Sequence, residues 1–349
     1  MKDIILNSKA YKEFVTTLAN RIEHARFRVS CAINSATQNL YWELGKEIVD
    51  RQQKESWGDS IVEALARDLQ SKFPARRGFS ARNIWRMRQF YLAYASFKVL
   101  PQAVAEIPWG QNVLLIEKIK NMEERLWYAE KSCENGWSRA VLWHQIDASL
   151  YRRQALVKKT TNFASTLPSP QSDMAEEIMK DPYNFDFFII DENAKEKVLH
   201  DALINNVQKF LLELGVGFAF VGSHYSIKVG NKTRELDLLF YHLKLKSYIV
   251  LELKSVEFEP EYIGKMQYYL TAVDTELKQE GDNPSIGIIL CKHKDNIEVE
   301  YALRQSNSPI GVSEYVLTRN LPKELIDSLP DTKILEEEIL KELDCDVSS

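Results

Sequence analysis

The chain has 349 residues, 45% of them hydrophobic, and a formal net charge of −5, so it can form two or three domains with cores of their own. It has no run of about 18 apolar residues, which excludes a membrane-spanning helix, and its first ten residues hold no secretory-type apolar stretch. The scattered cysteines form no metal-type pair and predict free thiols. We therefore expect a cytoplasmic protein without zinc.

The charge is unevenly distributed along the chain. Residues 1–170 sum to +9 and residues 171–349 to −14, and all seven tryptophans lie between Trp42 and Trp143. Two compositions in one chain predict two domains. The basic half is the candidate for binding phosphates, which attract Lys and Arg whatever the base sequence. Drift in surface charge, without any ligand, is the alternative interpretation.

The N-terminal half has the apolar spacing of helices, over residues 33–48 and again over residues 61–69. Pro74 ends the second helix, and Ser80 is placed to cap a new helix that runs to about Phe97. A helix, a Gly-containing turn and a basic second helix are the outline of a helix-turn-helix. Further helices are expected over residues 112–120, 123–135 and 138–153. A solvated helical face explains the same basic cluster, whose members are Arg76, Arg77, Arg82, Arg86 and Arg88.

The pattern divides the chain into four parts. Residues 1–155 form a helical domain for DNA binding or assembly, and residues 156–188, rich in Ser, Thr and Pro, form a linker. Residues 189–325 follow as an α/β domain: a helix over 195–214, strands over 218–229, 235–242 and 248–254, a helix over 260–277, and strands over 285–291 and 311–317. Residues 326–349 are an acidic tail that we expect to be a short helix fraying into disorder.

Charged residues interrupt two of these apolar strands. If the strands that hold Asp237 and Glu252 pair as a hairpin, Asp237 comes opposite Glu252 and Lys254, because alternate residues of a strand share one face. Two carboxylates and an ammonium in an apolar sheet cost several kcal/mol unless they serve each other or a ligand. An ion pair that merely closes the hairpin is the simpler explanation.

These residues resemble the active site of the PD-(D/E)xK nucleases. Longer motifs resemble the YhcG-type family of bacterial PD-(D/E)xK proteins over nearly the whole chain, in both halves. The matching stretches include Tyr41-Trp42-Glu43-Leu44-Gly45, Gly78-Phe79-Ser80-Ala81-Arg82-Asn83, Phe218-Ala219-Phe220-Val221-Gly222, Leu236-Asp237-Leu238-Leu239-Phe240-Tyr241-His242, Leu251-Glu252-Leu253-Lys254 and Gly264-Lys265-Met266.

The resemblance implies an α+β protein in two domains: an all-α N-terminal domain and a restriction-endonuclease-like domain with an αβββαβ core. It implies a metal-dependent DNA endonuclease in which Asp237, Glu252 and the Leu253 carbonyl bind Mg²⁺ or Mn²⁺. Lys254 would hold the attacking water or stabilise the transition state, and Gln267 would face the site or the DNA. A catalytically inactive nuclease fold that serves as a DNA-binding or scaffold protein is the alternative.

One position of the sequence departs from the family pattern. Family members carry a glutamate on the first helix of the nuclease domain, where this chain has His200 followed by Asp201. Either residue could contribute to the metal site, or the site could lack this ligand. We expect an imidazole to favour Mn²⁺ over Mg²⁺. The partners expected are DNA and a second copy of the chain, since paired active sites suit the cutting of both strands.

Overall fold

The computed structural model describes the chain except for residues 1–8, 56–59, 75–77, 186, 188–194 and 318–349. It divides into two compact units, Met1–Tyr151 and Arg152–Ser349, and each unit is described by itself. Within the described residues, no helix is long and apolar enough to cross a membrane. Arg76, Arg77 and the acidic tail lie outside the described residues.

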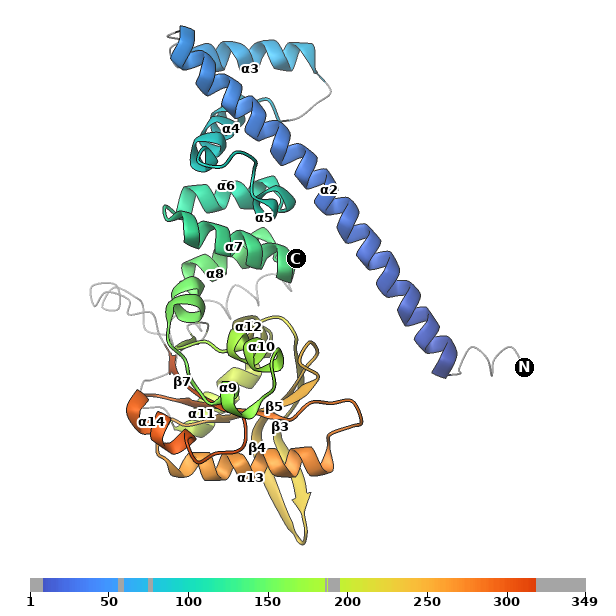
Figure 1. Cartoon of the computed structure of the whole chain (residues 1–349), viewed down its shortest axis with the longest axis vertical. Helices are drawn as coiled ribbons and strands as arrows, with labels where there is room; N and C mark the ends of the chain where they lie inside the picture. The colour runs from blue at the N-terminus through green and yellow to red at the C-terminus, as the bar shows by residue number, and fades with distance from the viewer. Residues whose placement is uncertain (1–8, 56–59, 75–77, 186, 188–194, 318–349) are drawn as a thin grey trace, which may run out of the picture. The chain divides into compact units, whose positions relative to one another are not determined.

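The first unit is all helical (Figure 1). Ser80 caps α4 by accepting a hydrogen bond from the Asn83 backbone, and Ser138 caps α8 in the same way from Val141. Gly136 ends α7 at a φ of 60°, the left-handed conformation that favours glycine. The cap predicted at Ser80 is therefore confirmed. The helices are α2 (Lys9–Glu55), α3 (Ser60–Lys72), α4 (Ala81–Tyr94), α5 (Gln102–Glu106), α6 (Trp109–Lys118), α7 (Met122–Asn135) and α8 (Arg139–Asp147).

Aromatic side chains fill the core of this unit. Phe90 and Tyr94 of α4 are fully buried, and the rings of Phe90 and Trp109 meet edge to face with centroids 5.2 Å apart. The buried Arg125 side chain donates hydrogen bonds to the Ile119 and Ala93 carbonyls and lies over the Tyr94 ring. Five of the tryptophans, Trp42, Trp85, Trp109, Trp127 and Trp137, pack against the cores of the first unit, whereas Trp143 is exposed.

The second unit is built on a seven-stranded mixed sheet in the order β1-β7-β6-β5-β4-β3, with β2 pairing beside β7. β3, β4 and β5 are antiparallel, whereas β5, β6 and β7 run parallel. The strands are β1 (Thr160–Thr161), β2 (Tyr183–Asn184), β3 (Phe218–Val229), β4 (Lys232–His242), β5 (Ser247–Leu253), β6 (Ile286–Cys291) and β7 (Ile310–Val316).

Helices cover both faces of this sheet. One core joins the sheet to α10, α11 and α12, and the other joins it to α13 and α14. β5 and β6 are buried on both faces, which explains their almost continuous apolar sequence. This architecture confirms the predicted α+β class. The helices are α9 (Phe163–Thr166), α10 (Gln171–Ile178), α11 (Glu196–Asn205), α12 (Val207–Leu214), α13 (Glu261–Glu276) and α14 (Asn296–Leu303), after a π-helix at Arg152–Leu156.

The segment expected as a linker differs from the prediction. It contains β1, α9, α10 and β2, and Phe163, Leu167 and Met179 are buried in the core of the second unit. Its Ser and Pro residues mark tight connections between short elements, while its spaced apolar residues supply the packing. The single helix expected over residues 195–214 is also two helices, α11 and α12, which are separated at Asn206.

Candidate active site

The pairing of β4 with β5 brings Asp237 to Glu252. Leu238 lies opposite Leu251, and one further step in this antiparallel register sets Asp237 opposite Glu252. There the Leu253 backbone N–H donates to Asp237 Oδ2 at 3.0 Å. The predicted hairpin thus forms, and both carboxylates come to one side of the sheet at its end.

The Glu252 carboxylate is buried, with a residue exposure of 2%, and its two oxygens differ. Oε1 accepts hydrogen bonds from two ammonium groups, Lys254 Nζ at 3.0 Å and Lys265 Nζ. Oε2 is buried and has no hydrogen-bond partner among the described residues. A buried carboxylate oxygen without a partner costs free energy, and such a group calls for a ligand or a solvent molecule.

Lys254 lies at the centre of the cluster. Its Nζ donates to Glu252 Oε1, to the Leu253 carbonyl at 2.9 Å and to Glu196 Oε1 at 3.1 Å. Its ammonium also lies over the Tyr262 ring, 5.5 Å from the centroid. Burial by itself lowers the pKa of Lys254, but the surrounding carboxylates outweigh it and raise the pKa above its usual value. Lys254 is therefore a fixed cation in this site.

In contrast to Lys254, whose charged form is favoured, Asp237 is shifted toward its neutral form. Burial, and then the negative charge of Glu252, raise the pKa of Asp237 from 3.8 to about 6. The Leu253 N–H and the two lysines act against this shift without cancelling it. Two carboxylates forced together in this way are stabilised by a shared cation.

The donors present fit a hard divalent cation. Glu252 Oε2 is unsatisfied, Asp237 is destabilised as an anion, and the Leu253 carbonyl directly follows Glu252 in the sequence. Within the described residues, no group of three Asp, Glu, His or Cys side chains converges on one point. Two carboxylates with water and phosphate oxygens form the ligand set that Mg²⁺ prefers.

Two charged residues of this cluster were not predicted. Glu196, in the first turn of α11, pairs with Lys254, and Lys265 of α13 pairs with Glu252. Glu196 lies four residues before His200, so the same helical face could have pointed to it. Lys265 belongs to the motif Gly264-Lys265-Met266. That motif contributed to the family resemblance, but the resemblance gave none of its residues a role.

His200 is buried beside the backbone of β4. Its Nε2 lies 3.1 Å from the Asp237 carbonyl oxygen, and its ring lies 4.0 Å from the ring of His224. His200 Nδ1 has no hydrogen-bond partner among the described residues. Asp201 points outward, with its side chain 57% exposed. His224 Nδ1 in turn lies 2.6 Å from Glu235 Oε1. Glu235 is on β4, the strand of Asp237, and its carboxylate is engaged by this contact.

The remaining candidates are Gln267 of α13 and the arginines of the first unit. Gln267 is half-buried on α13 two residues after Lys265, so the two side chains leave the helix in different directions. Arg86 pairs with Glu117, and Arg88 donates to Gln52, whereas Arg82 is exposed. The DNA-binding role of these arginines stays a prediction.

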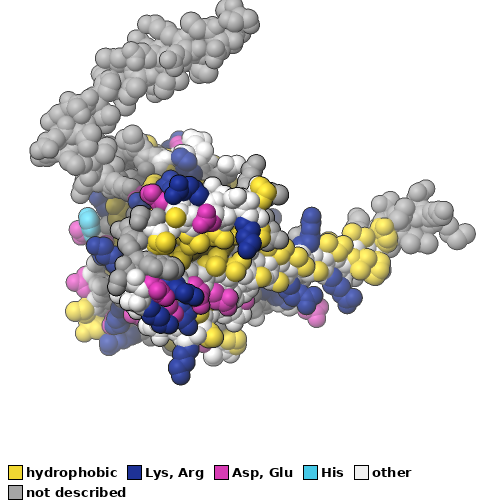
Figure 2. Space-filling model, turned by 90° about the horizontal axis from the view of Figure 1, so that it is seen from above, with side chains coloured by type: hydrophobic (Ala, Val, Ile, Leu, Met, Phe, Trp, Pro, Cys, Tyr) yellow, Lys and Arg dark blue, Asp and Glu magenta, His cyan; other side chains and the backbone are white. Residues whose placement is uncertain are grey.

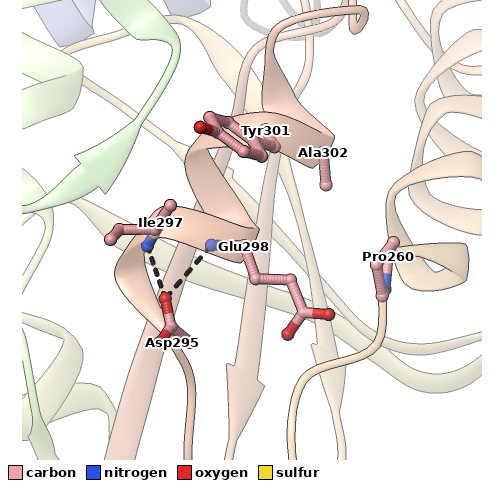
Figure 3. Close-up of a pocket in the computed structure, with 6 residues that line it drawn as sticks. All are labelled: Pro260, Asp295, Ile297, Glu298, Tyr301 and Ala302. Carbon is pink, nitrogen blue, oxygen red and sulfur yellow. Dashed lines mark hydrogen bonds between the residues drawn. The ribbon is translucent and has the colours of Figure 1, made fainter.

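A shallow pocket of 480 Å³ lies elsewhere in the second unit (Figure 3). Pro260 at the start of α13 lines it, together with Asp295 before α14 and residues along that helix up to Ala302. Asp295 there accepts hydrogen bonds from the Ile297 and Glu298 backbones, as a helix cap does. None of the predicted catalytic residues lines this pocket, so it is separate from the candidate site.

Comparison with known proteins finds a matching family model for each half of the chain. Residues 176–330 match the family model "YhcG PDDEXK nuclease domain", and residues 17–153 match the "DUF1016 N-terminal domain". The chain is 27% identical over 361 residues to the protein named "Putative nuclease YhcG" of Escherichia coli (strain K12). That alignment covers 94% of this chain and 96% of the relative.

A solved structure with a partial match is the "crystal structure of a repair endonuclease from Pyrococcus abyssi". It matches with 14% identity and a TM-score of 0.25, over 36% of this chain and 48% of that chain. The present chain thus spans about half the length of that structure.

The fold, the two-carboxylate site and the family matches define a helical domain followed by a nuclease domain of the PD-(D/E)xK class. Over most of its length, and in both halves, the chain is similar to the YhcG-like PD-(D/E)xK nuclease proteins.

Proposed function

We propose that the chain is a divalent-metal-dependent DNA endonuclease whose helical unit binds DNA, dimerises or does both. The observation that carries the proposal is the Glu252 carboxylate, whose Oε1 is held by two lysines while Oε2 stays buried without a partner. The free cysteines Cys31, Cys133 and Cys291 suit a reducing compartment such as the cytoplasm.

Four side chains of the cluster and the Leu253 carbonyl have a role in the proposed phosphodiester hydrolysis. Asp237, Glu252 and the Leu253 carbonyl are the groups that would hold Mg²⁺ or Mn²⁺. A bound divalent ion would activate water and neutralise charge on the phosphate. Lys254, fixed as a cation, positions the water and stabilises the negative charge that develops on the phosphate oxygens. Glu196 keeps the Lys254 ammonium at this point by its hydrogen bond.

The cleavage assay uses plasmid, linear, branched and single-stranded DNA, each with Mg²⁺, Mn²⁺ or EDTA. We expect cleavage with metal and none with EDTA. Lys254→Ala and Glu252→Ala should each lower the rate by at least about a thousandfold, because each removes charge stabilisation from the transition state. The control is Lys244→Ala, which removes an exposed lysine from the turn between β4 and β5 and should leave the rate unchanged.

Circular dichroism and DNA binding of each variant distinguish loss of chemistry from loss of structure. Cleavage in EDTA, or undiminished cleavage by Lys254→Ala and Glu252→Ala, would overturn the assignment of the site. A folded parent protein that binds DNA but cleaves none of the substrates would instead be an inactive nuclease fold acting as a DNA-binding or scaffold protein.

A further inference from the structure

The first half of α2 lacks the packing that holds its second half. Every described side chain from Tyr11 to Ser30 is exposed. From residue 34 onward the helix is anchored, since Asn34 and Gln38 donate hydrogen bonds to the Glu106 and Ile107 carbonyls. In this anchored part Gly45 lies against Met87 of α4 and the Trp42 ring lies against Tyr91, and Figure 1 shows the other half extending beyond the helices of its unit.

This exposed half carries a heptad pattern. Val15, Ile22 and Val29 recur every seven residues, and their exposures are 45%, 58% and 59%. Leu18 lies three residues after Val15, and Ala25 and Ala32 continue its series. In Figure 2, hydrophobic side chains follow the extending part of α2, with Lys and Arg along its side. The alternating spacing of three and four residues is that of positions a and d in a coiled coil.

An apolar helical face of this kind is ordinarily covered by a partner. Most helical stability in proteins comes from the packing of such a face rather than from intrinsic helix propensity. The apolar residues of this face are also too regular and too continuous for scattered surface exposure. The described residues of the first unit offer nothing that covers them, so the face requires a partner from outside the unit.

We propose that the first half of α2 forms a two-stranded parallel coiled coil with the same segment of a second copy of this chain. The composition of the seam selects this partner. β-branched residues at position a with Leu at position d favour two parallel strands. Here a holds Val15, Ile22 and Val29, while d holds Leu18 followed by the small Ala25 and Ala32. In a symmetric dimer each residue of position a packs against its own copy.

Charge at the edges of the seam gives the dimer a characteristic salt dependence. Arg21 and Arg28 both occupy position g, where they border the apolar seam. In a parallel pair, position g of one helix faces position e of the next heptad of the other helix, so Arg21 faces Arg26 of the second copy. The dimer should therefore tighten as salt rises and screens these like charges. Binding to DNA weakens with salt. Opposite responses therefore separate a coiled-coil dimer from two copies bridged by nucleic acid.

Light scattering of the full-length protein after gel filtration, in EDTA and without DNA, measures the dimer over a range of concentrations. Ile22→Asp should raise the dimer dissociation constant at least about a hundredfold, because it places two carboxylates in the seam. Ser30→Asp, on the same exposed half but at position b, is the matched control and should leave the constant unchanged. Since Ile22 is exposed in the single chain, the substitution spares the core.

Cross-linking tests the orientation in a variant whose native cysteines are replaced by serine. Val15→Cys should form an intermolecular disulfide under oxidised glutathione, because the two residues meet in a parallel pair. A disulfide that forms only when Val15→Cys and Ala32→Cys proteins are mixed indicates antiparallel helices and overturns the proposal. A monomeric parent overturns it as well, as does equal loss of the dimer in the Ser30→Asp control.

The proposal rests on the dimerising role in the proposed function and not on cleavage. Loss of nuclease activity in Glu252→Ala should leave the dimer intact, whereas loss of the dimer in Ile22→Asp should shift plasmid products from double-strand breaks toward nicks. A catalytically inactive parent that still dimerises through Ile22 would sustain this inference while overturning the nuclease proposal.

Discussion

At the scale of single residues, Glu252 is stabilised by cations on one oxygen and open on the other. Lys254 and Lys265 come from different elements and meet the same Oε1. A buried carboxylate with two ammonium partners loses less free energy on burial than an isolated one. This arrangement satisfies Oε1 while Oε2 stays available to a ligand.

Asp237 carries a cost in stability that its function requires. Its folded-state pKa of about 6 lies above the ordinary value of 3.8, so the folded state binds a proton between these pH values where the unfolded state does not. Stability from this group is present at low pH and is lost as pH rises through about 6. We predict that Asp237→Asn, in EDTA, raises the unfolding free energy at pH 7.5 by about 1–2 kcal/mol, while abolishing cleavage.

Urea unfolding at pH 4.5 and pH 7.5 measures this effect, and the gain should shrink at the lower pH. Asp282→Asn is the contrasting control, because the Tyr241 hydroxyl lowers the pKa of Asp282 by hydrogen bonding. That change should give no gain at pH 7.5. A gain from Asp237→Asn that is equal at both pH values would contradict the titration account.

His200 supplies a second prediction at this scale. Its Nδ1 is buried without a hydrogen-bond partner, and its ring lies against the Asp237 backbone. A nitrogen donor near the carboxylates favours Mn²⁺ over Mg²⁺. We predict faster cleavage with Mn²⁺ and a smaller ratio of the two rates in His200→Glu. Asn205→Ala, at an exposed position of α11, should leave the ratio unchanged, and equal rates with both metals would contradict the prediction.

The sequence predicted Asp237, Glu252 and Lys254 because charged residues inside apolar strands are conspicuous. It did not single out Glu196 or Lys265, which lie on helices where charged residues are ordinary. Only the tertiary packing of α11 and α13 against the sheet shows that these side chains turn inward.

At the scale of elements, strands were predicted better than connections. β3 has the predicted bounds, and β5 and β6 differ from theirs by a residue, because alternation or continuous apolar runs define a strand locally. The expected linker failed for the opposite reason. Phe163, Leu167 and Met179 are spaced irregularly, and their burial depends on contacts with the distant β7 strand and the helices beside it. No periodic pattern marks such contacts.

The contact between α2 and α4 permits a prediction about one glycine. A Cβ at Gly45 would lie 2.1 Å from the Met87 carbonyl oxygen, so the two helices approach closely there. Gly→Ala inside a helix normally stabilises by about 1 kcal/mol. At Gly45 we predict the opposite sign, a loss of about 1–3 kcal/mol, since the helices must separate.

Tryptophan fluorescence during denaturant unfolding checks this loss, because all seven tryptophans belong to the first unit. The matched control is Gly264→Ala on α13, where a Cβ meets nothing within 4 Å. It should leave the fluorescence transition unchanged and slightly stabilise the second unit by circular dichroism. Unchanged fluorescence unfolding in Gly45→Ala would show that the helices relax at no cost.

At the scale of the whole molecule, the unit boundary changes the charge argument. Residues 1–151 carry a net charge of +5 and residues 152–349 one of −10. Four basic residues counted with the helical half belong to the second unit, where Arg153 pairs with Glu213 and Lys158 with Glu300. The asymmetry between the halves therefore persists with a smaller basic excess, and Arg82 is an exposed member of the predicted cluster within the described residues.

This asymmetry supplies the last prediction, which concerns where DNA is bound. If the helical unit contacts phosphates, Arg82→Gln in a Lys254→Ala background should weaken DNA binding and reduce the slope of log K against log salt by about one, since one counterion fewer is released. Fluorescence anisotropy in EDTA between low and moderate salt measures the slope. Arg304→Gln makes the same change in the acidic unit, where Arg304 lies over the Tyr301 ring, and should alter the slope little. The opposite result would be an unchanged salt slope in Arg82→Gln and a reduced slope in Arg304→Gln. It would indicate that the nuclease unit binds the DNA and that the helical unit serves assembly.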